Sequence, residues 1–229
     1  MDDARARIIA AALELLEQGG QDAVSTRAVS AAAGVQPPTI YRFFGDKDGL
    51  LDAVATQGFV NYRASKSARP PAEDPVADLR QGWDAHIELA LANPALYQLM
   101  QSRVWTDVAT SSAYAATAEL LTERIGRVAR AGRLRIPEPL AATLMQATCA
   151  GVALQLIATP ADERDPALSQ TAREAVIAAM TTDEPLGGSP GPASAAIALQ
   201  AALPTIDALS DNERALMGDW LARIATYNR

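Results

Sequence analysis

The stretch from residue 25 to residue 44 has residue types and a spacing suited to contacting a nucleic acid. It reads as two short helices, the first capped by Ser25 or Thr26 and the second opened by two prolines in its first turn. Gly34 lies where the chain must reverse, and a tight turn there favours the left-handed backbone that glycine adopts at little cost. Helix, turn and helix within about twenty residues is the spacing of a helix-turn-helix, whose second helix enters the major groove of DNA.

The apolar residues of this stretch divide its two helices into an inner and an outer face. Four of them have the spacing of a small core that locks the helices together: Val29, Val35, Ile40 and Phe44. The next four are expected to point largely away from that core: Thr39, Tyr41, Arg42 and Phe43. The outer face of the second helix therefore carries a hydroxyl, a phenol and a guanidinium, all of which bind phosphates or base edges.

Three runs in this part of the chain resemble the DNA-binding domain of the TetR (tetracycline repressor) family. They are TRAVSAAAGV at 26–35, PTIYRFF at 38–44 and KDGLL at 47–51. The resemblance covers about residues 4–60, and the chain departs from the family pattern at Pro38, often Gly or Ser, and at Phe43, often His. It implies a dimeric transcriptional regulator, most often a repressor, with an N-terminal helix-turn-helix domain and a helical ligand-binding domain.

The candidate DNA-binding residues follow from this resemblance and from their chemistry. They are Thr26, Arg27, Gln36, Pro37, Pro38, Thr39, Tyr41, Arg42 and Lys47. Thr26 and Arg27 begin a helix, where backbone N–H groups favour phosphate. Thr39 offers a methyl group to thymine, and Arg42 either binds guanine bidentately or holds a phosphate. Gln36 is placed to bind adenine, while Tyr41 and Lys47 resemble the phosphate contacts of the family.

The elements that must position these residues are all expected to be helices. Ala accounts for 49 of the 229 residues and has the highest helix propensity, and we find no convincing strand. Apolar periodicity and caps predict an all-α fold of about eleven helices. In addition to the two short helices within residues 25–44, the predicted helices span residues 4–18, 47–65, 75–92, 94–103, 107–131, 137–159, 166–182, 193–203 and 211–227. A break at 68–74 suggests two domains, a DNA-binding domain at 1–66 and an effector-binding and dimerisation domain at 67–229.

Composition and charge restrict the chemistry of the chain. With one cysteine and one histidine, it has no disulfide framework and no Cys/His metal site, so we expect neither a metal nor a cofactor. Residues 1–69 are electrically neutral and the rest carries the net charge of −7, which confines any DNA contact to the N-terminal part. The acidic N-terminus and the short apolar stretch at 149–158 predict a cytoplasmic protein without a signal peptide or membrane span.

The second part of the chain is expected to bind a small apolar molecule. The candidate wall residues are Trp83, His86, Ile87, Tyr97, Met100, Trp105, Tyr114, Met145 and Cys149. Aromatic faces and Met suit a flat or lipophilic ligand, and acidic neighbours such as Asp78 and Asp84 disfavour an anionic one. The alternative for each of these residues is ordinary core packing. Several arginines, beginning with Arg124 and Arg127, are predicted to form a helix face that is exposed to solvent.

Dimerisation is expected through the helices at 137–159 and 166–182. The first has one stripe of apolar or small residues: Leu140, Leu144, Ala147, Gly151 and Leu154. The second offers Val176, Ile177 and Met180, although both stripes could instead face the subunit's own core. A two-fold dimer demands a palindromic double-stranded operator.

The sequence predicts a sequence-specific DNA-binding regulator, a repressor released by its ligand. No phosphate-binding loop, dinucleotide-binding or serine-hydrolase motif is present, so we expect no enzymatic activity. The alternative is a helical ligand-binding or protein-interaction module whose helix-turn-helix no longer binds DNA. The net negative charge of the chain favours this alternative. The sequence leaves two questions open. One is whether the protein represses or activates transcription, and the other is whether the helices beyond residue 192 pack on their own subunit or on a partner.

Overall fold

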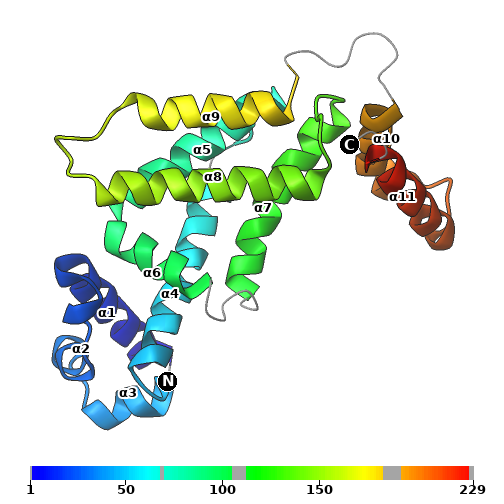
Figure 1. Cartoon of the computed structure of the whole chain (residues 1–229). Helices are drawn as coiled ribbons and strands as arrows, with labels where there is room; N and C mark the ends of the chain where they lie inside the picture. Colours follow the sequence, from blue (N-terminus) through cyan, green and yellow to red (C-terminus); the bar gives the residue numbers. More distant parts are fainter. Residues whose placement is uncertain (1, 68–69, 105–111, 183–191, 227–229) are drawn as a thin grey trace. The chain divides into compact units, whose positions relative to one another are not determined.

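A computed structural model describes residues 2–67, 70–104, 112–182 and 192–226, and the regular elements in these ranges are helices (Figure 1). Among them, strand-like pairing is limited to one isolated bridge between Leu134 and Thr181. The predicted all-α fold is confirmed. Most predicted helices agree with the observed bounds to within two residues; the helix predicted from residue 107 is described from Ser112 on.

The chain packs as two compact units, each assembled from separate stretches of sequence. The first comprises Met1–Arg69 and Glu88–Ala118, and the second comprises Pro70–Ile87 and Glu119–Arg229. This division describes packing, and the functional boundary near residue 66 stays a prediction.

The first unit is built on four N-terminal helices and α6. These are α1 (Asp2–Ala23), α2 (Thr26–Ala33), α3 (Pro37–Phe44), α4 (Lys47–Ser67) and α6 (Pro94–Val104). α1 packs against α2, α4 and α6, and its regular turns end at the two glycines Gly19 and Gly20. The fully buried centre of this unit includes Ile8, Leu16, Val29, Ile40, Leu50 and Leu99. An apolar core therefore fixes the helix-turn-helix on α1 and α4.

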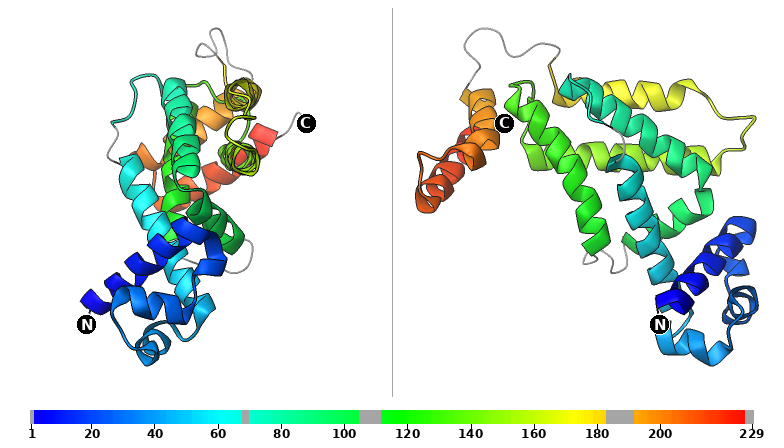
Figure 2. Two further views of the ribbon diagram at one scale, coloured as in Figure 1. Left: turned by 90° about the vertical axis from the view of Figure 1, so that its left-hand side faces the viewer. Right: turned by 180° about the vertical axis from the view of Figure 1, so that it is seen from behind.

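The second unit contains most of the remaining helices. They are α5 (Pro75–Ala92) and α7 (Ser112–Arg130), whose other ends belong to the first unit, then α8 (Glu138–Ala158), α9 (Ala167–Met180), α10 (Pro192–Ala202) and α11 (Asp211–Thr226). A short 3-10 helix, η2 (Leu203–Thr205), follows α10. α8 and α9 lie side by side in opposite directions, and α10 packs on α11 as a helical hairpin (Figures 1 and 2). A capping box begins α11, since Ser210 N donates to Glu213 Oε2 at 2.9 Å and Glu213 N donates to Ser210 Oγ at 3.4 Å.

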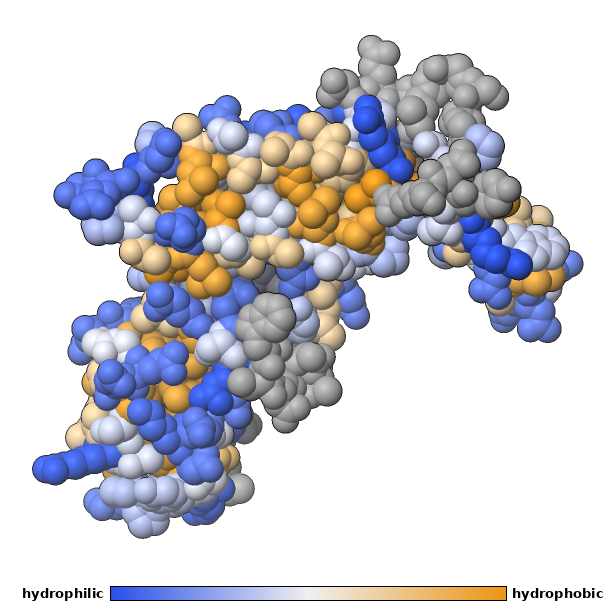
Figure 3. Space-filling model, in the orientation of Figure 1, coloured by the Kyte–Doolittle hydropathy of each residue, from blue (hydrophilic) through white to orange (hydrophobic). Residues whose placement is uncertain are grey.

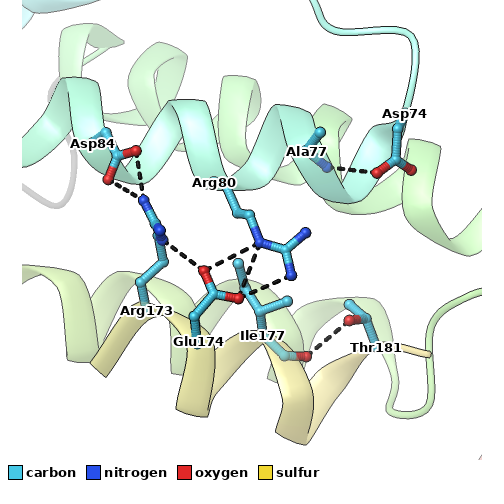
Figure 4. A network of polar contacts seen from close by, with 8 residues as sticks. All are labelled: Asp74, Ala77, Arg80, Asp84, Arg173, Glu174, Ile177 and Thr181. Carbon is cyan, nitrogen blue, oxygen red and sulfur yellow. Dashed lines mark hydrogen bonds and ion pairs between the residues drawn. The ribbon is translucent and has the colours of Figure 1, made fainter. Parts of the chain in front are cut away.

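Polar contacts hold α9 on α5 (Figure 4). The Arg80 guanidinium donates to both oxygens of Glu174 at 2.9–3.1 Å, and Arg173 joins Glu174 to Asp84. The hydrogen bond from Arg80 lowers the pKa of Glu174, burial opposes that shift, and Arg173 lowers the pKa further. Charged groups of alternating sign therefore join the two helices.

A buried carboxylate joins α5 to α7. Asp78 is 2% exposed and binds Arg124 at 3.3 Å and Arg127 at 2.9 Å. Arg127 also donates to the Ala72 carbonyl, whose own N–H donates to Asp78. The expectation of a solvated arginine face is therefore wrong for Arg124 and Arg127, which are mostly buried because they pair with Asp78.

Candidate nucleic-acid interface

The turn between α2 and α3 has the backbone geometry that its sequence predicts. The Ser25 hydroxyl accepts a hydrogen bond from Ala28 N and so caps α2. Gly34 ends that helix with φ of 64° and ψ of 39°, in the left-handed region. Pro37 and Pro38 then occupy the first turn of α3, where missing N–H groups cost little.

The small core beneath the turn is the predicted one, with one exception. Val29 and Ile40 are fully buried, and Val35 and Phe44 pack against the same cluster. Phe43 does not point away as predicted: it is half-buried against that cluster and lies under the Arg42 guanidinium, 5.0 Å from the ring centre. An aromatic ring on a helix this short buries part of its apolar area against the nearest core. The exposed face of α3 is therefore less apolar than predicted, with Tyr41 and Arg42 as its exposed polar side chains.

The residues predicted to contact DNA lie on one continuous segment, from the start of α2 to the start of α4. The exposed ones are Arg27, Gln36, Pro37, Pro38, Tyr41, Arg42 and Lys47, with Tyr41 52% exposed. Thr26 and Thr39 are half-buried. The arrangement presents cations, a phenol and an amide on and beside α3, a combination that can contact phosphates and base edges. Their contacts with DNA stay a prediction.

The start of α4 is fixed by two local hydrogen bonds. The Asp46 carboxylate accepts a hydrogen bond from Gly49 N at 2.8 Å and caps the helix. The Lys47 ammonium donates to the Gln21 carbonyl at the end of α1, at 3.1 Å. This contact holds the lysine beside the helix-turn-helix while its side chain stays exposed.

Sequence reasoning misses a charged group from α6 at the same place. Arg103 forms ion pairs with Asp48 at 3.0 Å and with Asp52 at 3.1 Å, on the first turns of α4. Arg103 and Asp48 are 55 residues apart, and no spacing rule connects them.

The predicted ligand-wall residues fall into both compact units. Tyr97, Met100 and Tyr114 belong to the first, and Trp83, His86, Ile87, Met145 and Cys149 to the second. Most are buried; His86 and Tyr114 are half-buried, and Trp105 lies outside the described residues. The Trp83 indole donates to Ser169 Oγ at 2.9 Å, and Tyr114 packs edge-on against Phe59. Their role in binding a ligand stays a prediction.

The acidic residues near these positions do not select the charge of a ligand. The prediction treats Asp78 and Asp84 as acidic surroundings that disfavour an anionic molecule. Asp78 is neutralised by Arg124 and Arg127, and Asp84 pairs with Arg173. The preference for an uncharged ligand therefore rests on the apolar side chains alone.

The two predicted dimerisation helices differ in what they expose. On α8, Ala147 and Gly151 are exposed, and Leu140 and Leu154 are 42% and 37% exposed. Apolar side chains gather on the face of the molecule along which α8 runs (Figure 3). On α9, Val176, Ile177 and Met180 are at most 5% exposed, so their assignment to a dimer surface is wrong. They pack inside their own subunit, and α9 exposes instead Leu168, Thr171, Ala175, Ala178 and Ala179.

α8 has an unusually apolar composition. Its one charged residue is Glu138, and an 18-residue window has a mean hydropathy of 1.6 with 33% of the window buried. Among the described helices it alone is long and apolar enough to cross a membrane by those measures, although a core helix of a water-soluble protein passes the same test.

Comparison with known proteins identifies the N-terminal domain. Residues 8–54 match the family model of the bacterial regulatory proteins, tetR family. The chain carries a TetR-family DNA-binding domain. Over 48 residues it is 46% identical to the class A tetracycline repressor from transposon 1721 of Escherichia coli, covering 21% of this chain and 22% of that protein. Over 72 residues it is 38% identical to the HTH-type transcriptional repressor KstR of Rhodococcus jostii, covering 31% and 34%.

Solved structures extend the TetR-family likeness to the fold of the larger part of the chain. A putative tetR family regulator from Shewanella sp. PV-4 superposes with a TM-score of 0.62 at 19% identity, over 78% of this chain and 98% of that one. A TetR variant from Acinetobacter baumannii AYE, solved with minocycline, gives 0.59 at 24% identity, over 76% and 94%. Because α9 ends at residue 180 of 229, or 79% of the chain, α1–α9 are of the right length to account for this shared fold.

Proposed function

We propose that this protein is a transcriptional regulator, most simply a repressor, that binds a palindromic DNA operator as a homodimer and leaves it when a small apolar ligand binds. The observation that carries the proposal is the helix-turn-helix, with Gly34 in the left-handed turn and with Tyr41 and Arg42 of α3 exposed. The matched stretch spans less than a quarter of the tetracycline repressor's length, and the identity it shares lies in this domain.

The DNA-binding part is tested by binding to DNA from upstream of the protein's own gene. Tyr41→Ala and Lys47→Ala together remove two predicted phosphate contacts, so affinity should fall for every sequence and the slope of log affinity against log salt should flatten by about one to two units. Thr39→Ala should change base preference instead, costing about 1–3 kcal/mol at one position of the operator. Fluorescence anisotropy over a salt series measures both effects.

Arg223→Ala is the matched control for the loss of a positive charge. Arg223 is exposed on α11, outside the DNA-binding domain, and its replacement should leave affinity and salt slope unchanged. Unchanged binding by the Tyr41→Ala, Lys47→Ala variant would show that the docking mode is wrong. Absence of any sequence-specific binding would favour the alternative of a helical module that no longer binds DNA.

The dimer is proposed to form through α8 and the exposed side of α9. A face that runs along a 21-residue helix and has no charge after Glu138 is costly to leave in water. Ala147 and Gly151 at its centre allow the same helix of a second copy to approach closely. A two-fold axis there would make the surface self-complementary, as closed dimers require.

The ligand is proposed to be uncharged and lipophilic, because the predicted wall residues are mostly apolar and aromatic. One structure of the same fold contains a small molecule, minocycline. A thermal-shift screen should find lipophilic compounds that raise the melting temperature, since a ligand that binds only the folded state stabilises it. Tyr114→Phe and Tyr97→Phe, made singly, remove only a hydroxyl group, and each should weaken the binding of such a compound if that hydroxyl orients it. Stabilisation by phosphorylated metabolites alone would contradict the proposal.

A further inference from the structure

Two carboxylates lie at the end of α4 that is expected to approach DNA. Asp48 directly follows Lys47, the predicted phosphate contact, and Asp52 is one helical turn further along the same face. DNA presents a dense row of negative phosphates, and carboxylates beside a phosphate-binding lysine oppose its attraction. A DNA-binding surface with this sequence needs something to compensate for them.

Arg103 of α6 provides that compensation. One guanidinium nitrogen lies 3.0 Å from Asp48 Oδ1 and another lies 3.1 Å from Asp52 Oδ1, so a single side chain bridges both carboxylates. The planar fork of arginine allows this, whereas a lysine ammonium has one charged nitrogen. The Arg103 side chain is only 17% exposed, while those of Asp48 and Asp52 are 78% and 49% exposed.

α6 is held in the position that this bridge requires. α4 and α6 cross closely at Gly58, where a Cβ atom would lie 2.8 Å from Met100 Sδ. Met100 precedes Arg103 by one helical turn, so the same crossing places the guanidinium over the start of α4. Packing, rather than the exposed ion pairs, fixes the geometry.

The exposure of the two carboxylates decides what these ion pairs can do. Ion pairs between exposed groups add little to folding stability because water screens them. Their charges still act on phosphates that come within a Debye length, about 10 Å at 0.1 M salt. Arg103 therefore matters more for the local potential at α4 than for holding the fold together.

We propose that Arg103 is a positioning residue for DNA binding, which cancels one of the two negative charges of Asp48 and Asp52 so that the start of α4 can approach the phosphate backbone. The inference rests on the proposed function and adds to it a contribution from α6, a helix outside the helix-turn-helix. DNA affinity then depends on α6 staying against α4, because moving Arg103 away changes the net charge of this group of side chains at the start of α4 from −1 to −2.

The test compares variants on the DNA fragment that the wild-type protein retards. Arg103→Met should weaken binding about fivefold at 50 mM salt, the size expected when one uncompensated charge repels two or three phosphates through water. The defect should shrink at 300 mM salt, because screening removes repulsion but would not repair a misfolded surface. Arg103→Lys should recover part of the loss, and Arg223→Met, which removes a distant exposed cation, should bind like the wild type.

The decisive variant is Asp48→Asn combined with Asp52→Asn. If charge compensation is the role of Arg103, this double variant binds DNA more tightly than the wild type. The triple variant, which adds Arg103→Met, should then bind at least as tightly as the wild type. If the double variant binds as weakly as Arg103→Met, the ion pairs serve geometry and the inference is overturned. Failure of the wild-type protein to bind any fragment specifically would instead overturn the proposed function.

Discussion

At the residue scale, the backbone of Gly34 carries the helix-turn-helix. Its φ of 64° is a conformation that other residues adopt at a cost, and a Cβ atom there would meet no atom within 4 Å. Gly34→Ala should therefore lower the free energy of unfolding by about 1 kcal/mol through backbone strain alone. Urea denaturation measures this loss.

Gly218→Ala is the matched control for Gly34→Ala. Gly218 lies inside α11, where an added Cβ would make ordinary contact with Leu203 at 3.9 Å. Alanine should there raise stability by up to about 1 kcal/mol, because it has the higher helix propensity. Equal effects of the two substitutions would contradict the assignment of strain to the turn.

Helix caps and tight turns, which depend on residues within one helical turn of each other, are predictable from the sequence. The caps at Ser25 and Asp46 and the reversal at Gly34 depend on neighbours three or four residues away. Arg127 and Asp78, in contrast, are 49 residues apart and meet only because α5 and α7 pack together. Long-range ion pairs of this kind leave no periodic trace in a single sequence, which is why sequence reasoning misses Arg103.

At the element scale, the contact of α9 with α5 should weaken in acid. Arg80 and Arg173 keep the pKa of Glu174 below its usual 4.5, so the stability that this carboxylate adds is present above pH 4.5 and is lost as pH falls through its lower folded-state pKa. The Glu174 side chain is 40% exposed, and screening limits the contribution to about 0.5 kcal/mol. Glu174→Gln should cost about that much at pH 7 and progressively less below pH 4.5, by thermal or urea unfolding.

Glu163→Gln controls for the loss of one negative charge, since this exposed carboxylate lies between α8 and α9. A pH profile of Glu174→Gln that parallels that of the wild type would show that the pairing with Arg80 and Arg173 adds no stability.

Apolar stripes predict where the helices are, but not which partner each stripe covers. The stripe on α9 that includes Val176 and Ile177 faces its own subunit, whereas Leu140 and Leu154 on α8 stay exposed. Both patterns have the same helical period, so the pattern alone cannot separate a core face from an interface. Phe43 illustrates the same difficulty on a smaller scale.

At the scale of the whole molecule, the proposed dimer predicts that one exposed position controls assembly. A Cβ atom added at Gly151 would meet nothing within 4 Å, so the isolated subunit can accommodate a large side chain there. Gly151→Arg should leave the helical circular dichroism spectrum unchanged and shift the protein from dimer to monomer in sedimentation velocity at micromolar concentration. It should also weaken operator binding, because two linked domains gain affinity from each other.

Val60→Arg is the control for adding a charge to an exposed apolar position. Val60 is 47% exposed on α4, and its replacement should leave the dimer intact. A wild-type protein that sediments as a monomer would remove both the α8–α9 interface and the palindromic operator from the proposal.

The uncharged length of α8 also has a consequence during synthesis of the chain. α8 leaves the ribosome before α9 and long before any second copy can cover it, as a 21-residue segment whose charge is confined to Glu138 at its first position. Such a segment is attractive to chaperones and to the membrane-insertion machinery until it is buried. If the proposed dimer covers α8, the cellular yield of this protein should depend on how fast newly made chains pair, and strong overexpression should cause more aggregation than low expression.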